Sequence, residues 1–288
     1  MAEFGSQQIL KPGLYVVATP IGNLGDLSPR AKHILAEVDM IACEDTRVTA
    51  RLLTANLIKK PLVPYHEHNG PVARPKILAK LASGGKVALV SDAGTPLISD
   101  PGFKLVAEAQ DAGHLVSAVP GPCAAVMALS LAGLPTDRFL FMGFPPGKSK
   151  ARQSWFKAEA KTHASLVFYE SAKRVADCLK DAADVLGARQ AAICRELTKR
   201  FEEVRRDNLL ALAAHYSEAD TPKGEIVVVI GPPAEHSHDD ATALDMEALL
   251  TAALKHMSVK SASAFVAELT DVPKKTIYAR ALELTKGR

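Results

Sequence analysis

The feature that most constrains the fold is a regular alternation of short apolar runs with longer amphipathic runs over residues 14–131. The short runs have the length of buried strands, and the longer runs place apolar residues at helical spacing. Strands that alternate with helices are typical of an α/β domain, in which helices cover a sheet. The expected strands are residues 14–18, 40–43, 61–65, 86–90 and 115–119, and the expected helices are residues 29–38, 46–56, 72–82, 103–111 and 124–131.

A second α/β domain is predicted beyond a junction at residues 136–150, which are rich in Gly, Pro and Lys. Ser171 is expected to cap a helix whose apolar face holds Val175 and Leu179. Residues 231–240 have the composition of a linker. The expected strands here are residues 139–143, 166–169, 191–194, 201–205 and 226–230, and the expected organisation is a disordered leader at 1–13, α/β domains at 14–120 and 121–232, and a helical domain at 241–288.

The C-terminal segment has only helical patterns, at residues 243–256, 262–269 and 274–284, with a turn at 270–273. The last helix carries Lys274, Lys275, Tyr278 and Arg280. A helix, a short turn and a basic second helix are typical of a helix-turn-helix domain. A small tail that only packs on the rest of the protein would show the same pattern.

Composition limits the class of protein. Apolar residues make up 48% and charged residues 23%, so a large buried core is expected. The net charge of +3 is too small to indicate a polyanionic partner, but residues 147–206 hold 14 Lys and Arg against 8 Asp and Glu. That excess fits a nucleic-acid contact or simply a solvated basic face. The four cysteines match no zinc spacing and no secretory signal or membrane-spanning run is present, which predicts a cytoplasmic protein.

The densest cluster of turn-forming and polar residues follows the strand predicted at residues 86–90. Residues 91–102 contain two glycines, two prolines, two aspartates, two serines and a threonine. A plain connection needs about six residues or fewer, whereas this composition suits a loop that wraps round a ligand. Because open α/β sheets hold ligands at the carboxyl ends of their strands, we predict a binding loop here. Glycine-bearing turns at residues 19–26 and 119–125 fit the same role, or tight packing of a strand on a helix.

Acidic and histidine side chains at strand ends are the candidate bases. Glu44, Asp45 and His66 follow predicted strands of the first domain, Asp92 opens the binding loop, and Glu170 ends a strand of the second domain. Asp45 is equally suited to cap the next helix. An ion-pair network between residues 168–171 and 194–199 would also explain the charges there. The histidines at 66 and 68 lack a third ligand of known position, so no metal site is expected.

Taken in their order, these motifs resemble the tetrapyrrole (corrin/porphyrin) methylase superfamily, and within it the branch that methylates ribosomal RNA. The resemblance covers about residues 14–231, and the C-terminal helices resemble the tail of the same RNA enzymes. Its motifs are specific in combination, although each is weak alone. The matching segments are residues 17–26, 44–47, 66–69, 90–102, 120–125, 144–150, 168–171, 195–199 and 223–230.

The resemblance implies two α/β domains with a cofactor cleft between them, a homodimer, and S-adenosylmethionine as a methyl donor that leaves as S-adenosylhomocysteine. It implies that the acceptor is the 2′-hydroxyl of a cytidine in 16S rRNA, in the decoding region of the small ribosomal subunit. The superfamily's Gly-Asp-Pro loop corresponds to Gly94-Thr95-Pro96, where a hydroxyl replaces the carboxylate. The resemblance implies that the following residues of this sequence contact the methyl donor: Pro20, Ala93, Gly94, Thr95, Ile98, Cys123, Ala124, Tyr169, Glu170, Gly224 and Glu225.

The implied chemistry needs alignment of oxygen, carbon and sulfur, and it needs no metal because the donor methyl is already activated. A base among Glu44, Asp45, His66, Asp92 and Glu170 would assist the weakly nucleophilic alcohol. Trp155 and Tyr278 fit either base stacking or internal packing. The expected RNA contacts are Lys148, Lys150, Arg152, Lys199, Lys274, Lys275 and Arg280.

Two other functions remain open at this point. A methylase of the same superfamily that acts on a tetrapyrrole precursor would need neither the Lys-rich segment at residues 147–152 nor the helical tail. A non-catalytic RNA-binding assembly factor would not need the loop at residues 91–102. Donor-induced thermal stabilisation separates the methylases from the assembly factor, and salt-dependent RNA binding separates the two methylases.

Overall fold

The computed structural model describes residues 10–234, 238–270 and 272–286, and it divides the chain into two compact units, residues 1–233 and 234–288. Most of the leader predicted at residues 1–13 lies outside the described residues. Within the described ranges, no helix is both long enough and apolar enough to cross a membrane.

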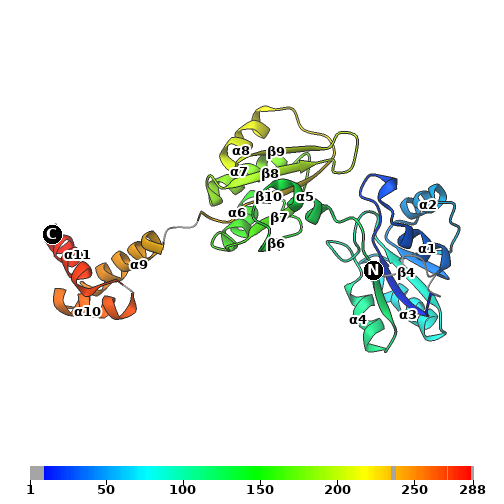
Figure 1. Ribbon diagram of the computed structural model, residues 1–288, viewed down its shortest axis with the longest axis horizontal. Helices are drawn as coiled ribbons and strands as arrows, with labels where there is room; N and C mark the ends of the chain where they lie inside the picture. Colours follow the sequence, from blue (N-terminus) through cyan, green and yellow to red (C-terminus); the bar gives the residue numbers. More distant parts are fainter. Residues whose placement is uncertain (1–9, 235–237, 271, 287–288) are drawn as a thin grey trace, which may run out of the picture. The chain divides into compact units, whose positions relative to one another are not determined.

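The first half of unit 1 is an all-parallel sheet of five strands in the order β3-β2-β4-β1-β5 (Figure 1). Alternate residues of each strand face opposite ways, so Tyr15 and Val17 pack with helices α1 and α2, while Leu14 and Leu89 pack with α3 and α4. The apolar runs are therefore buried on both faces, as parallel strands require. The elements are β1 (Gly13–Val17), η1 (Leu24–Asp26), α1 (Pro29–Glu37), β2 (Met40–Cys43), α2 (Thr46–Ala55), β3 (Leu62–Pro64), α3 (Gly70–Ala82), β4 (Lys86–Val90), α4 (Phe103–Asp111) and β5 (Val116–Val119).

The second half of unit 1 is a mixed sheet in the order β6-β7-β10-β8-β9, in which only β6 and β7 are parallel (Figure 1). Helices α6, α7 and α8 share the apolar core on one face, and α5 packs on the other. The elements are α5 (Ala124–Ala132), β6 (Phe139–Phe141), α6 (Ser149–Ala158), β7 (Ser165–Ser171), α7 (Val175–Leu186), β8 (Gln190–Arg195), β9 (Glu203–Asn208), α8 (Leu209–Glu218) and β10 (Glu225–Ile230).

Two expectations for this half need correction, and two of its helices, α6 and α8, were not predicted. Ser171 does not cap α7: it belongs to β7, and the residue before the helix is Arg174, which makes no side-chain cap. The ion-pair network expected between residues 168–171 and 194–199 is also absent among the described residues, because Glu170 pairs with Arg174 and Arg195 pairs with Glu203.

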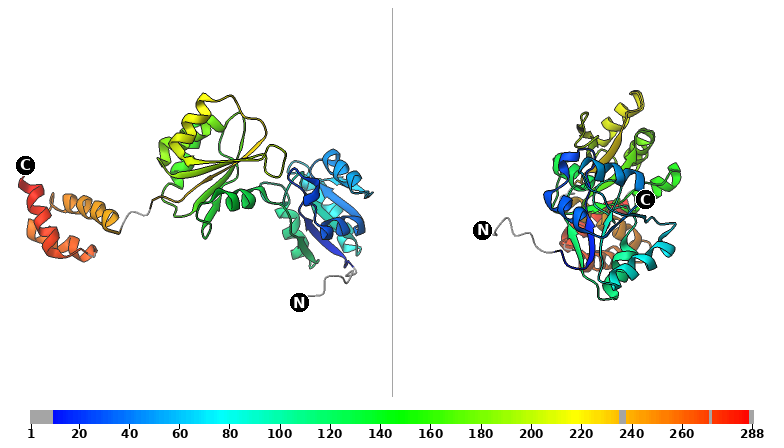
Figure 2. Two further views of the ribbon diagram at one scale, coloured as in Figure 1. Left: turned by 45° about the horizontal axis from the view of Figure 1, so that its top comes forward. Right: turned by 90° about the vertical axis from the view of Figure 1, so that its right-hand side faces the viewer.

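The described residues of unit 2 form three helices, which are drawn in orange to red in Figure 2. They are α9 (His238–Ala253), α10 (Val259–Leu269) and α11 (Lys274–Lys286). Leu250, Val266 and Ile277, one from each helix, are completely buried in a core of their own. The hydroxyl of Ser258 caps α10 by accepting a hydrogen bond from the Ser261 amide at 3.2 Å. The predicted helical domain is therefore present, with its basic residues at the start of the last helix.

Candidate active site

Three turns at the carboxyl ends of the neighbouring strands β4, β1 and β5 of the first sheet are tied together by hydrogen bonds. The amide of Thr19 donates to the carbonyl of Gly94 at 2.9 Å, and the amide of Gly94 donates back to Thr19 at 3.0 Å. The hydroxyl of Thr95 donates to the carbonyl of Pro122 at 2.9 Å. The threonine that replaces the superfamily's aspartate thus joins the turn after β4 to the turn after β5. The three turns form one rigid wall.

The binding loop that begins at Ser91 stores backbone strain. Leu97 and Ser99 have φ angles of 75° and 65°, which are unfavourable for residues with a side chain. Strain of this kind costs about 1–3 kcal/mol per residue and persists only where the surroundings enforce it. The strained backbone therefore fixes the positions of particular side chains. Among them, Ser99 and Asp100 line two cavities at this end of the sheet.

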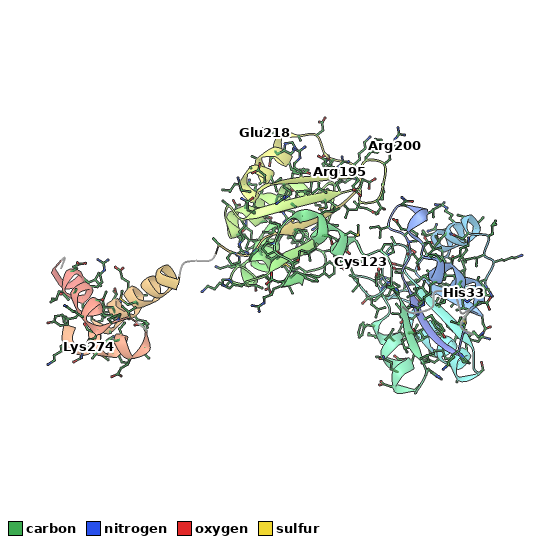
Figure 3. The ribbon with its side chains drawn as sticks, in the orientation of Figure 1. His33, Cys123, Arg195, Arg200, Glu218 and Lys274 are labelled. Carbon is green, nitrogen blue, oxygen red and sulfur yellow. The ribbon has the colours of Figure 1, made fainter. Side chains whose placement is uncertain are left out.

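A smaller cavity of about 300 Å³ lies against this wall, between the binding loop and residues of the second sheet. Its volume is in the range of small-molecule sites. Cys123, at the start of α5 and labelled in Figure 3, lies on its lining together with Phe144 and Ile226. Pro20 and Gly224 are not on the lining. The other nine donor contacts implied by the resemblance line it: Ala93, Gly94, Thr95, Ile98, Cys123, Ala124, Tyr169, Glu170 and Glu225.

A larger cavity of about 920 Å³ adjoins the ends of β2, β3 and β4. Its lining combines polar and apolar surface, with carboxylates beside the basic side chains of Arg47, Arg74 and Lys104. Phe103 is exposed over 66% of its surface and also lies on this lining. Four of the candidate bases are brought together here, namely Glu44, Asp45, His66 and Asp92, whereas Glu170 lies on the smaller cavity.

Three of the candidate carboxylates already have partners. Asp45 caps α2 through the amide of Arg47 at 2.8 Å and pairs with its guanidinium at 2.6 Å, so the pKa of Asp45 falls to about 2. Asp92 accepts a hydrogen bond from the Asp45 amide at 2.9 Å. Glu170 accepts one from the Ser171 amide at 2.7 Å and lies 3.3 Å from the guanidinium of Arg174. These bonds fix the walls of the two cavities.

Asp100 is a site residue that the sequence pattern did not single out. Among the described residues, it shares with Asp92 and Ser99 the property of lining both cavities. Burial raises the pKa of Asp100 to about 6, with a further upward contribution from Glu44. Burial likewise raises the pKa of Glu44, assisted by Asp92. In the sequence, Asp100 is one of several polar residues among the turn-formers of the binding loop. Nothing in the sequence distinguishes it as a residue that lines both cavities.

The expected RNA contacts fall into separate groups. Lys148, Lys150, Lys274 and Lys275 are exposed, and Lys274 is labelled at the start of α11 in Figure 3. Arg152 was wrongly placed among them, because it is 3% exposed and its guanidinium lies 2.6 Å from the Asp181 carboxylate. Arg280 is held by Glu247 and Glu283. Trp155 packs edge-on against Phe156 and Phe168, so its role is internal packing.

Lys199 takes part in a clamp rather than standing free for a phosphate. Its ammonium bonds to Glu196 at 2.8 Å and to Glu225 at 2.9 Å, and Glu225 lines the smaller cavity. The Glu225 amide donates to Glu196 at 3.1 Å, and a side chain at Gly22 would collide with the methylenes of Lys199. We call Glu196, Lys199 and Glu225 the clamp. Its hydrogen bonds join the loop after β8, which lies near the Arg195 and Arg200 labels in Figure 3, to the start of β10. The methylenes of Lys199 lie beside Gly22 in the turn after β1.

Comparison with known families gives two matches. Residues 13–213 match the model of Tetrapyrrole (Corrin/Porphyrin) Methylases, and residues 240–285 match that of the RsmI C-terminal HTH domain. The solved structure of a cobalt precorrin-4 methyltransferase aligns with a TM-score of 0.55 at 15% identity, covering 76% of this chain and 94% of that one. A diphthine synthase aligns with a TM-score of 0.59 at 17% identity, covering 76% and 89%. The predicted fold class is confirmed.

Relatives that match nearly the whole chain carry one name, ribosomal RNA small subunit methyltransferase I. The protein from Mesorhizobium japonicum is 49% identical over 96% of this chain and 93% of its own length. The protein from Erythrobacter litoralis is 49% identical over 97% and 98%, and that from Escherichia coli O157:H7 is 46% identical over 94% of each. The likeness therefore includes both units.

Proposed function

The chain belongs to the tetrapyrrole (corrin/porphyrin) methylases, and on that premise we propose that it is an S-adenosylmethionine-dependent methyltransferase of 16S rRNA. It transfers the methyl group to the 2′-hydroxyl of a cytidine ribose in the decoding region of the small ribosomal subunit. The observation that carries the proposal is a pair of adjoining cavities with a shared wall, one of cofactor size and one large and polar. Its relatives over the whole chain supply the substrate class.

The lining of the smaller cavity suits the donor. Ile98, Phe144 and Tyr169 offer apolar surface for an adenine ring, and Tyr169 packs edge-on against Phe144 at 5.4 Å between ring centres. The carboxylates of Glu170 and Glu225 suit the amino group, the ribose hydroxyls and the positive sulfonium of S-adenosylmethionine. When bound, that molecule supplies an activated methyl group. The rigid wall orients it toward the larger cavity.

The larger cavity suits a nucleotide that has left a base stack. Lys104 provides positive charge for a phosphate, beside the guanidiniums of Arg47 and Arg74, which are paired with Asp45 and Glu108. The exposed ring of Phe103 provides a stacking face. Enzymes that act on a nucleotide in structured RNA commonly require it to be single-stranded or flipped out. A cavity of about 920 Å³ has room for the nucleotide and the adjoining backbone.

The direct test is transfer of labelled methyl from S-adenosylmethionine to small ribosomal subunits that lack their native methylations, followed by nucleoside analysis. A 2′-O-methylated cytidine in 16S rRNA is the expected product. If the labelled methyl is found on a base instead of a ribose, the protein is still an rRNA methyltransferase, but the proposed acceptor atom is wrong. Transfer to a tetrapyrrole precursor and not to RNA would reject the proposed substrate.

The basic start of α11 is expected to bind RNA. Replacing Lys274 and Lys275 together by alanine should raise the KM for ribosomal subunits several-fold. It should also lower the salt dependence of RNA binding by roughly one to two in the log–log slope, since each phosphate that is no longer neutralised removes about 0.9. Lys260→Ala, an exposed lysine on α10, is the matched control. Equal slopes for the double variant and the control, from filter binding over a salt series, would reject the role. Donor affinity should not change in either variant.

The clamp is expected to support donor binding. Lys199→Met keeps the methylenes against Gly22 but removes the ammonium, so Glu196 and Glu225 are left as neighbouring negative charges. Because Glu225 lines the smaller cavity, we expect the Kd for S-adenosylmethionine to rise roughly threefold to tenfold, about 1 kcal/mol. Isothermal titration calorimetry measures it, with the exposed Lys161→Met as control. A Kd within twofold of the unchanged protein would show that the clamp is not needed.

A homodimer acting in the cytoplasm is part of the same proposal. The outward face of α5 exposes Val126, Met127 and Leu131, each between 37% and 50%, and Phe139 on β6 is 49% exposed. Apolar side chains gathered in this way are typical of an interface between subunits. Sedimentation equilibrium, which gives the mass in solution, distinguishes a dimer from a monomer.

A further inference from the structure

The shared wall of the two cavities is where the methyl group must cross. If the donor occupies the smaller cavity and the acceptor the larger one, the attacking oxygen lies against a residue that lines both. Within the part of the chain that the structure describes, these residues are Asp92, Ser99 and Asp100. A serine hydroxyl is too weak a base to take a proton from another alcohol, which leaves the two aspartates.

The hydrogen bonds of the site separate these aspartates. Asp92 holds the Asp45 amide at 2.9 Å, so one of its oxygens is committed to fixing the turn after β2. Glu44 lines only the larger cavity and Glu170 only the smaller one. Asp100 lies on both, partly buried, and the charged neighbours that influence it most are acids, Glu44 and Asp92. Its side-chain hydrogen-bond partner is the uncharged Ser91 hydroxyl, and unlike Asp92 it is not committed to fixing a neighbouring turn.

The backbone holds Asp100 in this place. Leu97 and Ser99 are forced into the left-handed region, and Gly102 follows with a φ of 146°. A side chain at Gly102 would contact Leu89 at 2.9 Å and Leu97 at 3.1 Å, so the loop is also packed closely on the sheet. A loop strained on one side of Asp100 and tightly packed on the other has little freedom to move its carboxylate. Preorganisation of this kind is what a catalytic group needs.

We propose that Asp100 is the general base of the methyl transfer, an inference that rests on the proposed function. One lone pair of the ribose 2′-oxygen forms the new O–C bond while the C–S bond breaks and its electron pair returns to sulfur. The 2′-hydroxyl proton passes to the Asp100 carboxylate. A sulfonium cation, a carboxylate anion and an alcohol become a thioether, a carboxylic acid and a methyl ether, so charge and atoms balance.

The electrostatics of the wall suit this role. Burial and the neighbouring acids raise the pKa of Asp100 to about 6, so the group is ionised at neutral pH and yet more basic than an ordinary carboxylate. The charged and titratable groups that line the two cavities with Asp100 come from several elements. They include Glu44 after β2, His66 after β3, Asp92 on its own loop, Lys104 on α4, Tyr169 and Glu170 on β7, and Glu225 on β10.

The test is Asp100→Asn, an isosteric change, in single-turnover methyl transfer to small ribosomal subunits with saturating donor. Removal of a general base lowers a rate by about 10²–10⁴-fold, and we expect at least the lower value. For the unchanged protein, the rate should rise with pH up to about 6 and then level off, because the carboxylate must be ionised to accept the proton. For the variant, the rate should show no such change of slope near pH 6, because the amide that replaces the carboxylate does not titrate. Donor affinity by calorimetry should stay within about threefold.

The matched control is Glu44→Gln, another carboxylate of raised pKa that lines only the larger cavity. It should keep the pH plateau, reached at a somewhat lower pH than in the unchanged protein, because removal of the Glu44 charge lowers the pKa of Asp100. A loss of the plateau in Glu44→Gln together with its retention in Asp100→Asn would overturn the assignment in favour of Glu44. A rate for Asp100→Asn within tenfold of the unchanged protein would also overturn it and leave the proposed function intact. Absence of transfer by the unchanged protein, despite donor binding, would instead reject the proposed function and the base with it.

Discussion

An alanine at Gly94 is expected to weaken donor binding on the order of tenfold or more. Gly94 has a φ of 81°, where a side chain costs about 1–2 kcal/mol. A methyl group there would stand 3.3 Å from Ile21 and 3.6 Å from the Pro122 carbonyl. Ile21 lines the smaller cavity, and Gly94 is paired with Thr19 through both of its backbone groups. The strain therefore falls on the wall that is meant to hold the donor.

Gly113 supplies the control for this prediction. Its φ is 76°, almost that of Gly94, but a methyl group there would meet nothing within 4 Å. Gly113→Ala and Gly94→Ala should thus lose similar unfolding free energy, about 1–2 kcal/mol by urea denaturation, from the same backbone strain. Only Gly94→Ala should raise the Kd for S-adenosylmethionine. Equal donor affinities would show that the turn after β4 is not part of the donor site.

The first sheet was predictable because its signals are local. Parallel strands buried on both faces leave continuous apolar runs such as residues 87–90 of β4, and each crossover carries its own amphipathic helix. The second sheet was less predictable because apolar runs do not reveal the direction in which strands pair, and β7 and β10 pair antiparallel. Helix α6 begins within a polar run that reads as a loop, since Lys148 to Lys150 hold no apolar residue.

The site shows the same division. The turns at the strand ends were predictable, because glycines, prolines and hydroxyls cluster there. The sequence did not predict which of the candidate bases is free to accept a proton, because that depends on which carboxylates form hydrogen bonds or ion pairs in the folded protein. Asp45 is neutralised by Arg47 two residues away, while Asp92 accepts a hydrogen bond from the Asp45 amide in the turn after β2. Asp100 stands out only when the left-handed conformations of Leu97 and Ser99 are known, and those depend on the folded loop.

Arg152 shows why charge counts mislead. A basic residue beside Lys148 and Lys150 reads as part of a phosphate-binding surface, yet its side chain turns inward to α7. Asp181 there is 5% exposed and accepts further hydrogen bonds from Ser149 at 2.7 Å and Gln153 at 3.0 Å. Burial raises the pKa of Asp181, but the bonds from Ser149, Arg152 and Gln153 outweigh it and hold the pKa below its usual value. The stabilisation is thus present at neutral pH and is lost as the pH falls through the lowered pKa.

Breaking this pair is expected to have the largest effect on stability. Asp181→Leu leaves the Arg152 guanidinium buried without its carboxylate, and Arg152→Met leaves the carboxylate without its cation. Each should lower the unfolding free energy by about 3–5 kcal/mol, as removal of one member of a buried pair does. The double variant should recover most of that loss, because two apolar side chains can replace a buried ion pair.

Urea denaturation of the two single variants and the double variant gives the coupling energy directly. The exposed Lys150→Met on the same helix is the control, with an expected change within about 0.5 kcal/mol. Methyl transfer per folded molecule should be unaltered in the double variant, because Arg152 is buried against Asp181 and does not reach RNA. If the double variant is stable but binds RNA more weakly, Arg152 contributes to RNA binding after all. Additive losses, with no recovery, would mean that the two side chains stabilise the fold independently.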